Sequence, residues 1–429
     1  MVSNIITNSR PKETDNWKGN LTLWLFLFLS FGYPIQASIP IFLHIPSTPI
    51  NATFRGLYLF ISIFLIVNSF KRSNKLPKGI KALIFFWILY GIRLIYDVSF
   101  RGIKLGDKDA LYIYSFAFGS CFFPMLAVIL NAKYINLNSI YKKLYSIMAL
   151  SNLLLLILIV YQNGSLSLNL FTSRISITGG DNESVINTII IGLYGDLLFV
   201  LSVYSLLFLR FKNSLIKLLV IFFGLTGLLN LIAAASRGPL VVMVLIVIYM
   251  VYFKYKIVSR RADFLAKTIM ISIITIFFVL ITGFLDNLTE RFTIFSRFEQ
   301  FGQDLKSGEK EARSYEYSSA WDQFCDSPIF GDRFTTRLDS TYPHNIYLEV
   351  LMSLGIVGMA LLLFLHWEVF RRIKYIFKKK DYIFFLLLII LLIIFLSSMT
   401  SGGIGFNPGL WLIFALFLSV KYKNVKYGH

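Results

Sequence analysis

The chain has 429 residues, of which 56% are hydrophobic, 17% aromatic and only 15% charged. Hydrophobic runs of about 20 residues recur from end to end, which excludes a soluble globular protein and indicates a polytopic membrane protein. These runs lack the two-residue alternation of membrane β-barrels, so the predicted fold class is all-α. The formal net charge of +19 is explained more simply by membrane topology than by nucleic-acid binding.

Twelve membrane-spanning helices are predicted in chain order. They lie near 21–42, 52–70, 82–100, 111–130, 144–162, 184–209, 214–235, 238–255, 264–285, 345–370, 382–398 and 408–422. Six helices occupy 1–213, three occupy 214–285, a long polar interval follows in 286–344, and three helices occupy 345–429. A cleaved signal peptide is the alternative for 21–38, but its long n-region of mixed charge and the eleven later spans favour a retained helix.

The distribution of basic residues predicts the orientation of the chain. With both termini in the cytoplasm, 28 Lys and Arg fall on inner segments and 13 on outer ones, and Arg93, inside a span, completes the 42. Basic clusters lie at 71–81, 254–267 and 371–380. By the positive-inside rule the interval 286–344 is then outside, as one large loop. Its seven basic and eleven acidic side chains do not form a nucleic-acid surface.

Three ionisable residues within the predicted spans need partners. Arg93 and Asp97 are four residues apart on one helix face, which favours an internal ion pair over a polar cavity lining. Asp196 falls near the middle of its span, where an ionised carboxylate needs a partner such as Arg93 or contact with water. Outside the spans, Arg174 stands alone in the connection 163–183, either solvated or in contact with an anion.

The join between the seventh and eighth spans has the composition of an anion site. Ser236 is a suitable N-cap, Pro239 fits the first helical turn, and Gly238 allows a close backbone approach. Arg237, beside the free amides of a helix start, matches phosphate oxygens with its guanidinium fork. The alternative is an arginine that extends to lipid headgroups.

The outer interval contains a predicted amphipathic helix from Glu311 to Phe324. Arg313, Tyr317, Trp321 and Phe324 share one side of it, which is typical of a helix at the membrane interface. Arg313 has Glu309 as an alternative ion-pair partner. Turn signals at Ser327–Pro328 and Gly331–Asp332 end the helix.

The interval ends in Tyr342–Pro343–His344–Asn345, which leads into the tenth span. A histidine in the first turn of a helix is disfavoured as the imidazolium by the helix dipole, so His344 is suited to be a general base. Glu349 is either a helper of His344 or half of a buried pair. Cys121 and Cys325 lack any spacing that indicates a metal site or a disulfide.

Taken together, Ser236–Arg237–Gly238, Arg313 ahead of Trp321, His344–Asn345 followed by Tyr347–Leu348–Glu349, and the run 354–358 resemble the O-antigen polymerase and O-antigen ligase superfamily. The resemblance covers roughly residues 214–370. It implies a GT-C-like glycosyltransferase of the bacterial inner membrane that needs no metal or other cofactor. It further implies that Arg237, Arg313 and His344 are the catalytic residues, with Arg291, Arg297, Arg333 and Arg337 as competitors for the role of Arg313.

The resemblance also implies the substrate, an oligosaccharide linked to undecaprenyl pyrophosphate, and the partners: membrane lipids and chain-length regulator and flippase proteins. Asn345, Arg174, Trp321 and Tyr317 are the expected substrate-binding residues. The expected activity is polymerisation of repeat units into O-antigen or capsule, with inversion at the anomeric carbon. The alternatives are a ligase that transfers glycan to lipid A core and, from another class, a polysaccharide transporter.

Overall fold

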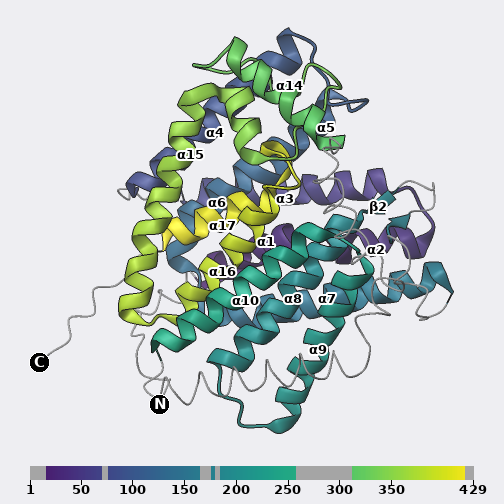
Figure 1. Cartoon of the computed structure of the whole chain (residues 1–429), viewed down its shortest axis with the longest axis vertical. Coiled ribbons are helices and arrows are strands. Elements are labelled where there is room, and N and C mark those ends of the chain that lie inside the picture. The colour runs from purple at the N-terminus through teal and green to yellow at the C-terminus, as the bar shows by residue number, and fades with distance from the viewer. Residues whose placement is uncertain (1–15, 70–75, 165–174, 179–183, 258–311, 421–429) are drawn as a thin grey trace, which may run out of the picture.

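The computed structural model describes residues 16–69, 76–164, 175–178, 184–257 and 312–420, and nearly all of these residues are helical (Figure 1). The elements up to residue 163 are α1 (Asn16–Phe31), α2 (Tyr33–Leu43), α3 (Ser47–Ser69), α4 (Lys78–Ile95), the π-helix η2 (Tyr96–Phe100), α5 (Ala110–Tyr114), the π-helix η3 (Ser115–Phe122), α6 (Phe123–Asn131), the 3₁₀ turn η4 (Ala132–Tyr134) and α7 (Leu137–Asn163).

The later elements begin with two short antiparallel strands, β1 (Ile177–Thr178) and β2 (Ser184–Ile186). They continue with α8 (Thr188–Phe208), α9 (Ser214–Ala233), α10 (Arg237–Ile257), α14 (Ala312–Asp326), α15 (Ile346–Lys379), α16 (Tyr382–Ser397), the 3₁₀ turn η6 (Ile404–Phe406) and α17 (Pro408–Ser419). The prediction of an all-α fold is confirmed for the described residues.

Eight described helices are long and apolar enough to cross a membrane, or nine if α1 and α2, bent by 65° at Gly32, count as one span. α16 and α17 are apolar but have only 16 and 12 residues. The predicted span 264–285 lies outside the described residues. The total of twelve spans therefore stays a prediction.

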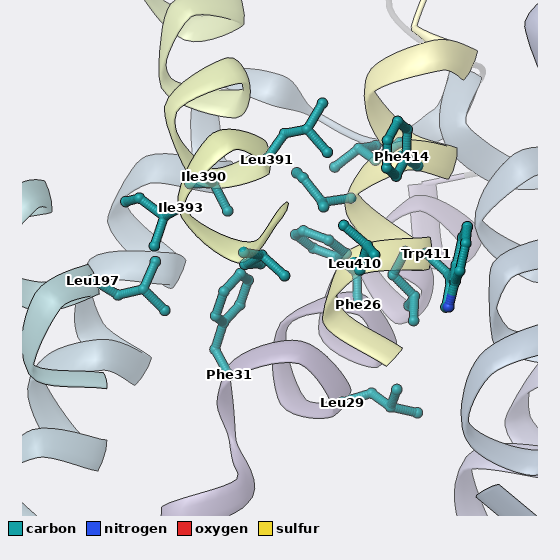
Figure 2. Close-up of a cluster of buried hydrophobic side chains, with 14 of the residues drawn as sticks. Phe26, Leu29, Phe31, Leu197, Ile390, Leu391, Ile393, Leu410, Trp411 and Phe414 are labelled. Atoms are coloured by element: carbon teal, nitrogen blue, oxygen red, sulfur yellow. The ribbon is translucent and has the colours of Figure 1, made fainter. Parts of the chain in front are cut away.

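The short helices α16 and α17 are central in the bundle. Residues 409–418 of α17 are all buried, and α16 is apolar on every side, as expected for helices that contact protein and not lipid. Figure 2 shows Phe26 and Phe31 of α1 packed with Leu410 of α17 and Ile393 of α16. Burial within protein also explains how these helices can be shorter than the roughly 30 Å of a bilayer core.

α15 is broken at Gly355, whose φ of 63° and ψ of −155° leave the helical region. The preceding loop inserts into this break: the amides of Ile356 and Val357 donate to the carbonyls of Pro328 and Ile329, at 2.8 and 3.3 Å. A Cβ on Gly355 would lie 2.4 Å from the Ile329 oxygen, so only glycine fits. The break thus fastens the loop between α14 and α15 to α15.

α8 carries the packing that positions the start of α10. Gly195 of α8 packs against Gly227 of α9, and a Cβ on Gly192 would lie 3.2 Å from Pro239 and 3.4 Å from Ser236. Asn230 of α9 donates to Asn152 of α7 at 2.9 Å. Small residues and side-chain amide bonds are the usual means of close helix contact in membranes. They hold the turn before α10 in a fixed place.

Candidate functional site

The turn between α16 and α17, residues 398–407, is irregular backbone among buried helices, so its polar groups need internal partners. The start of α15 supplies them. The amide of Ile346 donates to the Ser398 carbonyl at 3.2 Å, and both carboxylate oxygens of Glu349 accept from the amide of Ile404 at 2.9 Å. Glu349 is buried. The carboxylate therefore holds the turn by its backbone, and among the described residues it forms no ion pair.

His344 lies just before α15 at the edge of this turn. Its backbone is left-handed, with φ 52°, and its half-buried ring packs edge-on against Tyr342 at 4.6 Å between centroids. The expectation that His344 occupies the first helical turn is wrong, because Asn345 is the N-cap. The Asn345 Oδ1 accepts from the amides of Tyr347 and Leu348, at 3.0 and 3.2 Å. His344 is thus one residue outside the cap.

Asn345 also ties His344 to the irregular turn, since its Nδ2 donates to the Met399 carbonyl at 3.2 Å. Both the oxygen and the nitrogen of its side-chain amide therefore make contacts within the protein. The expected role of Asn345 in substrate binding stays a prediction beside this capping role.

Arg237 is the first residue of α10 and is half-buried. Its neighbour Gly238 meets the same irregular turn, because a Cβ on Gly238 would lie 3.0 Å from Thr400 Oγ1. Met399, which contacts Asn345, precedes Thr400 directly. Arg237–Gly238 and His344–Asn345 therefore flank one segment, residues 398–403, although 107 positions separate Arg237 from His344 in the sequence.

Two predicted site residues have no described side chain. Arg313 falls in the first turn of α14, but its side chain lies outside the described part of the structure, as do Arg174, Arg291 and Arg297. The competitors that are described bond within the loop. Arg333 donates to the carbonyls of Thr335 and Thr336, and Arg337 pairs with Asp326 and Asp332.

The helix predicted over Glu311–Phe324 is confirmed as α14. Trp321 is half-exposed and its ring contacts Phe324 at 5.3 Å, while Tyr317 is partly exposed. A shallow cleft of about 280 Å³ lies beside α14, lined by Tyr315, Ser318, Ser319, Asp322, Gln323, Arg337 and Leu338. Trp321 and Tyr317 are not among its lining residues, so their expected role in substrate binding stays a prediction.

The predicted Arg93–Asp97 ion pair is confirmed, with 3.8 Å between Nη1 and Oδ1. The pair does more than neutralise charge. Arg93 also donates to four backbone carbonyls at 2.7–3.1 Å, those of Phe330, Gly331 and Asp332 in the loop and that of Ser353 in α15. Asp97 accepts from the amide of Phe334 at 2.9 Å. The pair therefore clamps the loop between α14 and α15 onto α4 and η2.

Arg101 and Asp332 extend this clamp. Arg101 Nη2 lies 3.2 Å from Asp332 Oδ1, and Arg337 Nε lies 2.8 Å from Asp332 Oδ2. Burial acts to raise the pKa of Asp332, but the hydrogen bonds and charges of Arg337 and Arg101 outweigh it and hold the pKa below its usual value. Asp332 therefore stabilises the clamp above the pKa of a free carboxyl, and this contribution is lost as pH falls through the lowered value.

Asp196 does not have the expected partner. It is fully buried in α8, and neither carboxylate oxygen accepts a hydrogen bond from the residues that the structure describes. Arg93 is occupied by Asp97 and the loop carbonyls. The pairing of Asp196 with Arg93 is therefore wrong, because Asp97 and four backbone carbonyls satisfy the guanidinium.

Tyr342, beside His344, is a further ionisable group at the site. Burial, and then the nearby carboxylate of Glu349, raises the pKa of Tyr342 to about 12. The phenol therefore stays neutral near pH 7, which leaves the imidazole of His344 as the group suited to accept a proton there. Within the described ranges no three His, Cys, Asp or Glu side chains group in a way that could hold a metal.

The sequence missed the central part played by residues 398–403. The only signal was the glycine-rich run Ser401–Gly402–Gly403, which on its own is typical of any tight turn. Gly403 is pressed between elements: a Cβ there would lie 3.2 Å from both Glu349 Oε2 and Tyr342 Cγ.

The arrangement is that of a multi-pass helical membrane protein with an arginine and a histidine on one polar turn. A comparison with known families matches residues 222–363, about one third of the chain, to the family described as O-antigen ligase. The matched segment includes Arg237, Arg313 and His344. This segment of the chain is therefore similar to the O-antigen ligase family, which acts in surface polysaccharide biosynthesis.

Proteins of this family are polysaccharide-transferring enzymes, either O-antigen polymerases or ligases, and the family implies a lipid-linked glycan as substrate. No curated protein and no solved structure matches the chain.

Proposed function

We propose that the protein is a polymerase that joins oligosaccharide repeat units, carried on undecaprenyl pyrophosphate, into a surface polysaccharide at the outer face of the cytoplasmic membrane. The observation that carries this proposal is the meeting of Arg237–Gly238 and His344–Asn345 at residues 398–403, with both pairs inside the segment that matches the family. The orientation with both termini in the cytoplasm is part of the proposal.

The chemistry follows from the charges that change in the reaction. The hydroxyl oxygen of the acceptor sugar attacks C1 of the donor sugar, the bond from C1 to the pyrophosphate oxygen breaks, and the anomeric centre is inverted. The guanidinium of Arg237, with Arg313, stabilises the negative charge that develops on the leaving pyrophosphate. The neutral imidazole of His344 takes the proton from the acceptor hydroxyl. These groups need no metal ion for the transfer.

A ligase is the second candidate, because the matched family is described as O-antigen ligase. Such an enzyme uses the same donor and leaving group but transfers the glycan to lipid A core. The two activities differ in the acceptor, so glycan products separate them.

The test is complementation of a gene deletion with His344→Gln, followed by gel analysis of the glycans on lipid A core and on the lipid carrier. For a polymerase, the variant leaves core with a single repeat unit. For a ligase, it leaves bare core and polymer on the carrier. For a transporter, it leaves neither product. Arg237→Lys is expected to lower the amount of polymer at least tenfold, because a lysine lacks the guanidinium fork.

His44→Gln is the matched control, since His44 is an exposed histidine that also has a left-handed backbone, with φ 52°. It is expected to restore normal polymer. Full-length polymer in cells with His344→Gln, at a normal level of membrane-inserted protein, contradicts the proposal.

A further inference from the structure

Arg55 of α3 has no role in the site described so far. Its guanidinium carbon lies 3.5 Å from the ring centroid of Phe116 and 5.0 Å from that of Tyr112. Within the described ranges no carboxylate pairs with it. A half-buried arginine held by aromatic rings and not by a carboxylate keeps its net positive charge available to an anionic ligand.

A continuous row of rings joins Arg55 to His344. Phe116 and Tyr112 lie 5.2 and 6.4 Å from Phe406, Phe406 lies 5.8 Å from Tyr342, and Tyr342 lies 4.6 Å from His344. Here the rings Tyr112, Phe116, Phe406 and Tyr342 are called the aromatic row. The row is assembled from three distant parts of the chain, residues 112–116, 342 and 406. The π-helix η3, which carries Phe116, packs both against η6, which carries Phe406, and against α3, which carries Arg55.

The aromatic row is not sealed in the core. All four rings, Arg55 and His344 are only half-buried, unlike the fully buried Trp87 and Trp411 nearby in the bundle. Arg55 supplies the positive charge at the end far from His344, because Lys108, whose Nζ is 5.7 Å from the centroid of Tyr112, is paired with Asp107 at 3.4 Å. The row therefore offers partly open ring surfaces with positive charge at one end and the imidazole at the other.

These features match one class of ligand. Sugar rings have apolar C–H faces that pack on aromatic rings, and their hydroxyl edges remain in contact with water or polar groups. A row of several rings accommodates more than one sugar, and a cation at its end selects a carboxylate or phosphate on the chain. Because the row ends at His344, the proposed base, it is placed to bind the acceptor glycan, whose hydroxyl His344 deprotonates.

We propose that Arg55 and the aromatic row form a saccharide subsite that binds the sugars of the acceptor chain next to its reacting end, with Arg55 on an acidic group of that chain. This inference rests on the proposed function of His344. It assigns a binding role to Arg55, Tyr112, Phe116 and Phe406, which lie outside the family-matched segment.

The direct test is binding of the polysaccharide itself, purified from the producing cells and freed of lipid, to the whole protein in detergent. Arg55→Gln is expected to weaken binding about tenfold, the loss of one desolvated cation contact. Tyr112→Ala is expected to do the same, while Tyr112→Phe keeps the ring and binds nearly as the wild type does. Unchanged affinity in both Arg55→Gln and Tyr112→Ala overturns the proposal.

The acidic group is tested on the ligand side. Reduction of carboxyl groups and removal of phosphate groups from the purified polysaccharide separate the two sources of negative charge. Whichever treatment weakens binding to the wild type is expected to have no further effect on Arg55→Gln. If neither treatment changes binding to the wild type, the role of Arg55 is wrong.

Two exposed residues serve as matched controls. Lys104→Gln removes a cation from the loop that precedes α5, and Phe100→Ala removes an exposed ring from η2, and neither residue contacts the aromatic row. Both variants are expected to bind the polysaccharide as the wild type does. Equal loss of binding in Lys104→Gln and Arg55→Gln means general charge attraction and contradicts the subsite.

Failure of this inference is distinguishable from failure of the proposed function. In cells, Arg55→Gln is expected to shorten the polymer, whereas His344→Gln stops its formation. Normal chain lengths in Arg55→Gln beside lost polymer in His344→Gln overturn the subsite alone. Full polymer in His344→Gln overturns the proposed function, even where purified Arg55→Gln shows weakened binding.

Discussion

Asn345 shows how a single residue can set the position of a reactive neighbour. Its side chain caps α15 through the amides of Tyr347 and Leu348 and donates to Met399 of the irregular turn. Both contacts are made by one planar amide, so they fix the direction in which the chain enters the helix. His344, directly before it, is held at the turn for this reason.

We expect Asn345→Ser to retain most of the cap, because serine is a good N-cap, but to lose the contact with Met399. Asn345→Ala loses both, which costs about 1 to 2 kcal/mol for the cap and the amide bond together. The thermal stability of the purified protein in detergent is therefore expected to fall in the order wild type, Ser, Ala. Equal melting temperatures for the wild type and Asn345→Ala contradict this account.

At this scale the identity of the site residues stays a prediction, whereas the expected conformation of His344 is wrong. The choice of His344 needed only the residue types in the run 342–345. Its left-handed backbone and its place outside the cap depend on contacts with Tyr342 and, through Asn345, with Met399, and the latter lies more than 50 residues away. Such long-range contacts leave no local signal.

Hydrogen bonds of its backbone hold the loop between α14 and α15 against α15 and α4. Its carbonyls accept from the broken part of α15 and from Arg93, and the Asp332 amide donates to the Met352 carbonyl at 2.9 Å. The sequence predicted the Arg93–Asp97 pair from its i, i+4 spacing, and the pair is confirmed. It did not predict the loop carbonyls on Arg93, because their number and direction depend on the break at Gly355.

We expect Arg93→Lys to loosen this loop although it keeps the charge. A lysine ammonium cannot reach four carbonyls that a planar guanidinium fork contacts, and each lost charged hydrogen bond costs about 1.5 to 3 kcal/mol. Hydrogen exchange of the amides in 328–334 is therefore expected to accelerate by at least about tenfold.

Lys133→Arg is the matched control for Arg93→Lys, because Lys133 is exposed in η4, and within the described part of the chain its contact is a cation–π contact with its neighbour Tyr134. Its exchange pattern in 328–334 is expected to match the wild type. Unchanged exchange there in Arg93→Lys means that Asp97 and the backbone contacts alone hold the loop.

At the scale of the whole molecule, composition was enough to predict a polytopic helical membrane protein. Eleven of the twelve predicted spans overlap described helices, and 264–285 lies outside the described residues. Hydropathy did not reveal that α16 and α17 are too short to span alone, since a helix buried in protein and one in lipid are equally apolar. The bend between α1 and α2 was also missed, although Gly32 and Pro34, in the first turn of α2, are local signals of a helix end.

The orientation of the molecule in the membrane can be measured on α15, because the two ends of this helix differ in chemistry. Asn345 caps the first turn of α15 and contacts the irregular turn 398–407, and Lys378 and Lys379 lie in the last turn of α15. With 34 residues the helix is long enough to cross a bilayer, so these ends are expected on opposite faces. The positive-inside rule then puts α14 and Cys325 outside.

Cys325 provides a direct measurement of this orientation. The chain has two cysteines, of which Cys325 is exposed and Cys121 is buried, so the native protein offers one reactive thiol. We expect a membrane-impermeant maleimide to label the protein in intact spheroplasts, Cys325→Ser to abolish the labelling, and Cys121→Ser to leave it unchanged. Labelling that needs permeabilised membranes would place α14 in the cytoplasm. His344 and Arg237 would then lie on the face opposite to the one where a periplasmic polymerase must work, and the proposed function would be wrong as a whole.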